Sequence, residues 1–340
     1  MNDLNNIQVC PGTLRPGFAT YSPKCCKSLF DGYKVSHVLP FNRPTGITNA
    51  NDPVTANKLR ISISGVQEKY SLRQEGKQLV LATGGGTHIL KPISGSLHMA
   101  DQIPANEHLT MQIANQVYKL PTAANALIFF TDGSPAYITR RFDVQANGKR
   151  CLKEDFASLA GATVQSMGAD YKYDYSYAGI AELIDRYIPA AIPAKESLFK
   201  LVLFNYLFGN GDAHLKNFAR LDCMLDGQAV LAPAYDLLNT GLHIDDSDLA
   251  LHDGLYPKDY EYPSYASYGF YAYDDFYEFG LRIGLLPARI ARMMHPFRSR
   301  QEKVYTLLQH SYLNPIAQQK YFAIYEDRRS RLDRTYAQAL

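Results

Sequence analysis

The chain has 340 residues, with 35 lysines and arginines against 33 acidic residues and a formal net charge of +2. This balance argues against a protein that binds nucleic acid through a basic surface. A hydrophobic content of 46% and a charged content of 20% are typical of a globular rather than a disordered chain. At this length we expect two lobes rather than one compact lobe.

The N-terminus and the cysteines indicate the expected compartment. The first residues, MNDLNNIQVCPG, lack the basic and apolar regions of a secretory signal, and the longest apolar stretches are too short to cross a bilayer. The sequence therefore predicts a soluble cytoplasmic protein without membrane contacts. Five cysteines are an odd and sparse set for a disulfide scaffold. We expect reduced thiols at all of them: Cys10, Cys25, Cys26, Cys151 and Cys223. A zinc site at the first three is the alternative, although no CxxC pair is present.

The first 143 residues divide into two parts. Residues 1–58 are rich in Pro, Gly and Asn without a sustained period, which predicts an irregular arm. Residues 59–143 are predicted to form a small sheet with one inserted helix, 105–119, whose apolar residues follow a helical period. The expected strands are 59–63, 78–82, 87–90, 126–130 and 136–139.

Residues 144–340 are predicted to form a larger, helical lobe. Stretch 195–208 is apolar on nearly every side, which predicts a buried helix. The other expected elements are a helix at 180–188, short strands at 218–221 and 229–232, and helices from residue 274 onward. Eight tyrosines lie between Tyr256 and Tyr277. Packing on the large lobe and a surface that faces substrate are both open interpretations of them.

The sharpest motif is the segment GNGDAHLKNF, in which Asp212 and Asn217 have the D-x-x-x-x-N spacing of protein-kinase catalytic loops. In that arrangement the Asp accepts a proton from an attacking hydroxyl, and the Asn offers an oxygen to Mg²⁺. Asp236 follows a predicted strand pair and would supply a second metal-binding oxygen. His214 and Lys216 could neutralise charge on a transferred phosphoryl group. A plain polar loop is the alternative.

Two residues further upstream strengthen the interpretation of this segment as a kinase catalytic loop. Lys91 ends a predicted strand, where a kinase places the lysine that contacts the α- and β-phosphates of ATP. Glu107 lies in the first turn of the next predicted helix and can pair with Lys91. The alternative is an exposed surface lysine and an ordinary helix-terminal acid.

The segment ISISGVQEK, residues 61–69, occupies the position of a phosphate-binding loop but has one glycine instead of a GxGxxG cradle. Ser62 and Ser64 stand in it as candidate autophosphorylation sites, because a phosphate on either adds negative charge beside the phosphates of a nucleotide. A simple strand-to-strand turn is the alternative.

Together, the motifs SGVQEKYSL, THILKP, NEH, TRRFD, LFGNGDAHLKNF and LAPAYDLLN resemble the HipA family of bacterial serine/threonine kinases. The resemblance implies a two-lobed α+β protein-kinase-like fold with a small β-rich N-lobe and a larger helical C-lobe. The domains expected from it are the arm 1–58, an N-lobe at 59–143 and a C-lobe at 144–340. It also implies an ATP- and Mg²⁺-dependent serine/threonine protein kinase that acts as the toxin of a toxin–antitoxin system.

The resemblance assigns roles by motif position. Asp212 matches the catalytic base, Lys91 the ATP lysine, and Asn217 and Asp236 the metal ligands; His214 and Lys216 complete the catalytic set. Residues 140–142 fall at the hinge that holds adenine through the backbone, with Asp143 near the ribose. The nucleotide-binding set is Ser64, Gly65, Val66, Gln67, Glu68, Lys69, Lys91, Glu107, Arg140, Arg141, Phe142, Asp143, His214, Lys216, Asn217, Tyr235 and Asp236. Ser62 overlays the regulatory serine of the family.

The short N-terminal part and the Ser-Ile-Ser pair are similar to HipT-type kinases of three-gene systems. This implies three partners: an aminoacyl-tRNA synthetase as substrate (tryptophanyl- or glutamyl-), a helix-turn-helix antitoxin, and a small companion protein in place of the missing subdomain. DNA would be contacted only through the antitoxin. The alternatives are a secreted HipA-like effector kinase, a small-molecule phosphotransferase, and a non-catalytic scaffold or co-repressor acting with the antitoxin.

Overall fold

The computed structural model describes residues 7–43, 68–93, 95, 97–223, 228–257 and 260–336. The predicted strand 59–63 and most of the expected phosphate loop, including Ser62 and Ser64, lie outside the described residues.

A five-stranded antiparallel sheet forms the smaller part of the molecule, with strand order β2-β1-β3-β5-β4. The strands are β1 (Tyr70–Glu75), β2 (Gln78–Leu81), β3 (His88–Pro92), β4 (Asn125–Phe129) and β5 (Pro135–Arg140). Four of them agree with the expected strands to within two residues. β1 was not expected, because its YSLRQE sequence follows the presumed loop and alternates only over its first half.

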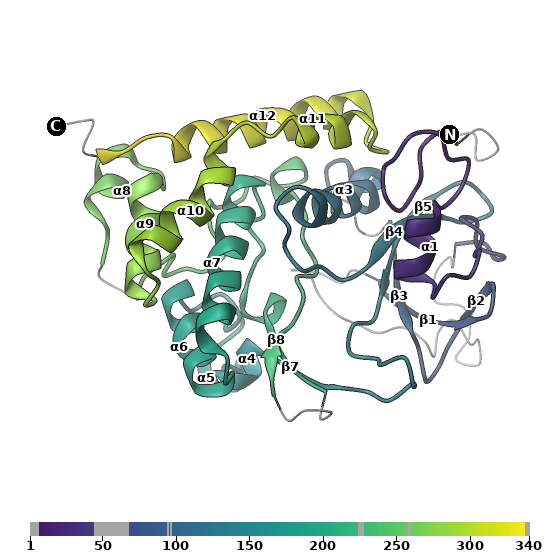
Figure 1. Ribbon diagram of the computed structural model, residues 1–340, viewed down its shortest axis with the longest axis horizontal. Helices are drawn as coiled ribbons and strands as arrows, with labels where there is room; N and C mark the ends of the chain where they lie inside the picture. Colours follow the sequence, from purple (N-terminus) through teal and green to yellow (C-terminus); the bar gives the residue numbers. More distant parts are fainter. Residues whose placement is uncertain are drawn as a thin grey trace.

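The sheet is covered on both faces. Alternate residues of β4 face opposite sides of the sheet. Ala126 and Ile128 pack with the N-terminal arm, whereas Leu127 and Phe129 belong to the larger core. The arm carries helix α1 (Pro23–Leu29), which begins at the Ser22 cap, and it lies over the sheet in Figure 1. The opposite face carries α3 (Ile103–Gln116), which begins two residues earlier than expected and so places Glu107 in its second turn.

The larger part of the molecule is helical and surrounds α7 (Ala191–Leu207) (Figure 1). As its apolar sequence predicts, α7 is buried through most of its length. The expected helix at 180–188 is α6 (Tyr177–Tyr187). The remaining helices are α4 (Phe156–Leu159), α5 (Val164–Met167), α8 (Pro263–Tyr268), α9 (Tyr273–Arg282), α10 (Pro287–Arg298), α11 (Glu302–Gln309) and α12 (Pro315–Leu332), with 3-10 turns η2 (Ala100–Gln102), η3 (Leu215–Asn217) and η4 (Thr240–Leu242). No helix among the described residues is both long and apolar enough to span a membrane.

A second, three-stranded sheet lies under the helical part. It consists of β6 (Leu152–Asp155), β7 (Ala219–Asp222) and β8 (Val230–Leu231), in the order β6-β7-β8. β7 follows η3 directly, and β6 contacts η3, so this sheet carries the segment with Asp212 and Asn217.

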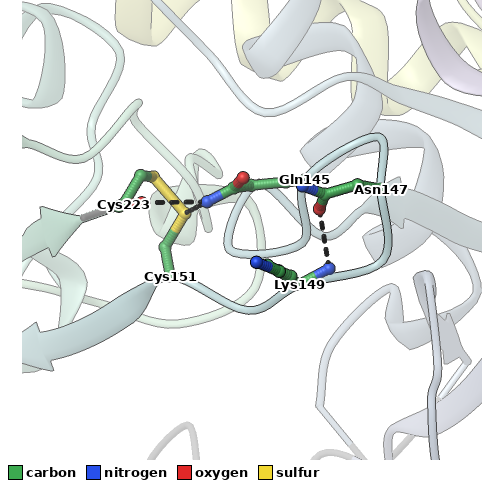
Figure 2. The surroundings of a disulfide bond; sticks show 5 residues. All are labelled: Gln145, Asn147, Lys149, Cys151 and Cys223. Carbon is green, nitrogen blue, oxygen red and sulfur yellow. Dashed lines mark hydrogen bonds between the residues drawn. A yellow bond between two sulfur atoms is a disulfide. The ribbon is translucent and has the colours of Figure 1, made fainter. Parts of the chain in front are cut away.

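The prediction of five reduced cysteines is wrong for two of them, because Cys151 and Cys223 form a disulfide (Figure 2). The register of the paired strands brings the two cysteines together. Leu152 of β6 lies opposite Asp222 of β7, so Cys151 and Cys223 form the next pair along the two strands. Gln145 donates a hydrogen bond from Nε2 to the carbonyl oxygen of Cys223 at 3.0 Å (Figure 2).

The three N-terminal cysteines are free and buried. The Cys10 sulfur accepts hydrogen bonds from the backbone N–H groups of Ser22 at 3.1 Å and Gly12 at 3.4 Å. Within the described ranges the structure groups no three His, Cys, Asp or Glu side chains for a metal ion.

The tyrosine-rich segment packs on the helical core, in agreement with the first of its two interpretations. Tyr260, Tyr262, Tyr271, Tyr273 and Tyr277 lie partly buried against that core. The guanidinium of Arg282 lies 3.7 Å from the ring centroid of Tyr260, in a cation–π contact that anchors the segment to α9.

Candidate active site

A cluster of buried charges lies between the sheet and the helical part. Lys91 Nζ lies 2.5 Å from Glu107 Oε1 and 2.5 Å from Asp236 Oδ1. Lys69 Nζ lies 3.5 Å from Asp236 Oδ2. The side chains of Lys91 and Glu107 are each 3% exposed, so the alternative of an exposed lysine and an ordinary helix-terminal acid is wrong.

Local structure explains why these groups meet. Lys91 pairs with Tyr137 across β3 and β5, and its ammonium lies 5.2 Å from the centroid of the Tyr137 ring. Tyr137 packs in the same core as Leu109 of α3, so strand alternation turns Lys91 toward the helix that carries Glu107. Asp236 has a left-handed backbone, with φ of 56°, a strained conformation that an Asp tolerates better than most residues.

Asn106, the residue before Glu107, ties α3 to the chain that follows Asp236. Its Nδ2 donates to the carbonyl oxygen of Asn239 at 2.8 Å, and its Oδ1 accepts from the Asn239 N–H at 3.1 Å. This pair of hydrogen bonds holds the Glu107 carboxylate and the Asp236 segment in one arrangement.

Burial and ion pairing set the protonation states in the cluster. Burial alone would lower the pKa of Lys91, but the carboxylates of Asp236 and Glu107 outweigh it and raise that pKa above its usual range. Burial would likewise raise the pKa of Asp236, but the surrounding lysines hold it well below its usual range. For Glu107, burial dominates and raises the pKa, although Lys91 counteracts part of this effect.

The loop that carries Asp212 forms a second group of polar side chains. The Tyr173 hydroxyl donates to Asp212 Oδ1 at 2.6 Å, and His214 Nε2 lies 3.9 Å from the same oxygen. Burial raises the pKa of Asp212, while the hydrogen bond from Tyr173 and the charge of Lys172 lower it in part. A carboxylate with a raised pKa is a better proton acceptor than an exposed one.

Asn217 closes this loop through its side chain. Its Oδ1 accepts the His214 backbone N–H at 3.2 Å, which joins the two ends of η3. The His214 imidazole is buried, and burial lowers its pKa to about 3. His214 is therefore neutral at pH 7 and does not supply the positive charge that the sequence led us to expect.

Two aromatic rings stand at the expected hinge. The centroids of Phe142 and Tyr235 are 5.4 Å apart, and the Tyr235 hydroxyl donates to the Lys216 carbonyl oxygen at 2.7 Å. Lys153 of β6 lies 4.3 Å from the Tyr235 ring centroid. Aromatic faces of this kind can stack on a planar base, and they also bind cations.

The sequence and the fold are matched by known proteins. A family model described as the HipA-like C-terminal domain matches residues 61–304. The chain belongs to this family.

Relatives of this HipA-family chain include a "Putative kinase" of Haemophilus influenzae, 29% identical over 310 residues, which are 86% of this chain and 87% of the relative. The "Serine/threonine-protein kinase toxin HipA" of Shewanella oneidensis is 27% identical over 204 residues, which are 55% of this chain and 45% of the toxin. The chain thus spans less than half of that longer relative.

Among solved structures, the complex of HipA, HipB and operator DNA from Shewanella oneidensis superimposes with a TM-score of 0.61 at 22% identity, over 85% of this chain and 67% of the other. The HipA-family chain therefore has the two-lobed, kinase-like α+β fold that its motifs predicted.

The predicted hinge residues differ in where their side chains lie. Arg140 leaves the site and pairs with Asp31 of the arm at 2.5 Å. Arg141 forms a two-pronged ion pair with Asp143, which leaves less of that carboxylate for a ribose. The backbone N–H groups of Arg140 and Arg141 already donate to Ala124 and Thr87, so within the described chain Phe142 offers the free hinge N–H.

The expected phosphate loop is described only at its end. Ser64, Gly65, Val66 and Gln67 lie outside the described residues. Glu68 accepts from the Tyr70 hydroxyl at 3.1 Å, and Lys69 points to Asp236, as given above.

Sequence reasoning missed four residues of the site: Asn106, Lys153, Lys172 and Tyr173. Asn106 lies inside the quoted NEH motif and could have been noticed there. The other three lie in segments without a motif, and their positions follow from the tertiary fold alone.

Proposed function

We propose that this HipA-family protein is an ATP-dependent serine/threonine protein kinase. The observation that supports this best is the buried Lys91–Glu107–Asp236 cluster, which lies near enough to the catalytic loop that the Asp236 carboxylate acts electrostatically on Asp212. A protein without phosphoryl transfer has no evident need for two carboxylates buried around one lysine, because such a cluster is expensive to desolvate.

In this proposal the chain's own residues divide the work. Lys91, held by Glu107, binds the α- and β-phosphates, and the Phe142 N–H holds adenine. Asp212 accepts the proton of the substrate hydroxyl as the oxygen attacks the γ-phosphorus. Lys216 and the neutral His214 lie beside the nucleotide, while Ser62 and Ser64 are the autophosphorylation sites.

Asn217 and Asp236 fit a magnesium ion by their chemistry. Both offer hard oxygen atoms, and the Asp236 side chain is 23% exposed. Bound there, the ion would neutralise phosphate charge and orient the γ-phosphoryl group. The lysines that now hold the Asp236 oxygens would share this carboxylate with it.

A direct test is incubation of the purified chain with Mg²⁺ and labelled ATP, alone and with cell lysate, followed by phosphopeptide mass spectrometry. We expect phosphate on Ser62 or Ser64 and on an aminoacyl-tRNA synthetase, tryptophanyl or glutamyl. The same phosphopeptides from Asp212→Ala protein would show that another kinase makes them, and the proposal would fail.

We further propose that the kinase is the toxin of a three-part system of the HipT type. The similar HipA of Shewanella oneidensis was solved with HipB and operator DNA, which supports a DNA-binding antitoxin as the partner. The test is co-expression with the small proteins encoded by the adjacent genes, followed by pull-down and growth measurement. If neither neighbour binds the kinase or relieves growth arrest, the three-part assignment is wrong.

A second candidate, a kinase that acts outside the reducing cytoplasm, is favoured by the Cys151–Cys223 disulfide. Disulfides persist mainly in oxidising compartments. Alkylation of thiols in intact cells before mass spectrometry separates the two candidates: modified Cys151 and Cys223 support the cytoplasmic toxin, and an unmodified pair supports the second candidate.

A further inference from the structure

The backbone of segment 171–175, between α5 and α6, is hydrogen-bonded to two other segments of the chain. Leu215 of the catalytic loop donates its N–H to the Lys172 carbonyl oxygen at 3.1 Å. His252 donates its N–H to the Tyr173 carbonyl oxygen at 2.9 Å. The segment therefore has a fixed position relative to Asp212, although the sequence contains no motif that connects them.

The Tyr173 side chain is also fixed. Its ring meets His214 edge to face at 5.1 Å between centroids and stacks on His252 at 5.8 Å. His252 is in turn held by Asp174, whose Oδ1 lies 2.7 Å from Nδ1 of the imidazole. Tyr173 thus presents its hydroxyl to Asp212 Oδ1 and leaves Oδ2 of that carboxylate free of this contact.

Lys172 differs from the other buried lysines described. Its ammonium is buried and has no hydrogen-bond acceptor in the described part of the chain, and it lies 4.7 Å from the Tyr173 ring centroid. Lys91 and Lys195, by contrast, are ion-paired, the latter with Asp185 at 2.9 Å. Burial of an ammonium without an acceptor costs several kcal/mol of folding free energy. The burial of Lys172 is therefore explained best by an anionic ligand that binds the ammonium.

We infer that Lys172 is a catalytic residue that binds a non-bridging oxygen of the transferred phosphoryl group, and that Tyr173 is a positioning residue for Asp212. This inference rests on the proposed kinase function. The substrate oxygen forms a bond to the γ-phosphorus, and its proton passes to the free oxygen of Asp212. The bond from the γ-phosphorus to the β,γ-bridging oxygen breaks, and ADP leaves with that electron pair. Lys172 holds the equatorial charge during the transfer, a role that Lys216 would otherwise have.

The electrostatics of the loop agree with this geometry. Burial lowers the pKa of Lys172, and among nearby groups the Asp212 carboxylate counteracts this effect most. An incoming phosphoryl group would supply the direct acceptor that Asp212 does not provide.

The decisive variant is Lys172→Met, compared with Lys172→Arg and Lys216→Met. We expect Lys172→Met to lower single-turnover phosphoryl transfer at least 100-fold, to leave the Kd for ADP within twofold of wild type, and to be partly rescued by Arg. Lys303→Met, on an exposed part of α11, is the matched control for loss of a lysine and should transfer phosphate at the wild-type rate. If Lys172→Met transfers phosphate within threefold of wild type, or Lys216→Met alone shows the loss, the assignment is wrong.

A binding measurement tests the same role without turnover. ADP with Mg²⁺ and aluminium fluoride mimics the phosphoryl group in transit, so Lys172→Met should weaken its binding at least tenfold while ADP binding stays unchanged. Equal weakening of both ligands would overturn the inference.

Thermal unfolding separates a structural role from a catalytic one. Removal of an unpaired buried charge should keep or raise the melting temperature, whereas a structural lysine would lower it. Tyr173→Phe should lower the transfer rate with unchanged ADP binding, and Tyr175→Phe, two residues along the same segment, is its control. Wild-type transfer that is lost in Asp212→Ala supports the kinase function independently, so a failure of the Lys172 variants alone refutes only this inference.

Discussion

The two ends of the candidate active site differ in how completely their charges are paired. At the Asp236 end, Lys91 contacts two carboxylates and Asp236 contacts two lysines. At the Asp212 end, one tyrosine hydroxyl satisfies one carboxylate oxygen, and the nearby ammonium of Lys172 has no hydrogen-bond acceptor among the described residues.

The two ends therefore differ in whether their charges need a ligand for balance. The Asp236 end is electrostatically balanced without one, so its residues contribute to folding as well as to nucleotide binding. The Asp212 end is left incomplete, which is a cost to stability that suits a place where charge is transferred. Substitutions should therefore act on activity at one end and on both activity and stability at the other.

The largest effect should come from Asp212→Asn. Loss of the proton acceptor should lower phosphoryl transfer by about 10²–10⁴-fold, while the melting temperature and the Kd for ADP stay near those of the wild type. Single-turnover assays with calorimetric titration of ADP measure both. A large loss of stability in this variant would show that the two ends do not differ in the way described.

Lys91→Met should affect stability as well as activity. It leaves the Glu107 and Asp236 carboxylates buried without their shared cation, which should lower the free energy of unfolding by roughly 3–5 kcal/mol. This loss of stability could not be predicted from the sequence, because the sequence does not show that Lys91 is buried. Urea unfolding measures the loss.

A double variant provides the control for that experiment. Lys91→Met combined with Glu107→Met removes both members of the buried pair and should recover part of the lost stability. If the double variant is as unstable as the sum of the two single variants, the pair is not coupled.

Tyr173→Phe should change the pH dependence of the reaction. Asp212 must be ionised to accept a proton, so the rate falls as the pH drops below its pKa, which burial raises. Because the Tyr173 hydroxyl lowers that pKa, its removal should move the acid limb of kcat/KM to higher pH, with rates converging above the limb. His214, Lys172, Asp236 and Asp246 face the same carboxylate and remain in place. An acid limb that does not move would contradict the hydrogen bond as a determinant of the base.

The smallest effect is expected for Arg140→Ala. Its side chain is partly exposed and pairs with Asp31 of the arm. The KM for ATP should stay within about twofold of wild type, and stability should fall by about 0.2–1 kcal/mol at most, as for exposed ion pairs. Steady-state kinetics check this, and a large rise in KM would return Arg140 to the nucleotide site.

The sequence was informative where a short-range pattern sets the geometry. Lys91 near the end of a strand and Glu107 early in the next helix are brought together by one strand-to-helix connection, so their pairing could be predicted. The burial of α7 likewise follows from the apolar residues around its whole circumference. The strand β1 was harder to predict, because its sequence has only a brief alternation.

The remaining features depend on contacts between distant segments. The Cys151–Cys223 disulfide joins residues 72 positions apart and requires the register of β6 and β7. Tyr173 meets Asp212 across 39 residues, with no motif to mark it. The direction of Arg140 was also not predictable, since a strand residue can face either side of its sheet until its neighbours are known.

The disulfide has a topological consequence. It closes residues 151–223 into a covalent ring that contains Lys172, Tyr173 and Asp212, whereas Lys91 and Asp236 lie outside it. Closure of a loop of this length restricts the unfolded chain and adds about 4 kcal/mol to stability in the chain-entropy view. Reduction of the disulfide would therefore remove this contribution to stability. After a single proteolytic cut within the ring, the two fragments stay covalently joined until the disulfide is reduced.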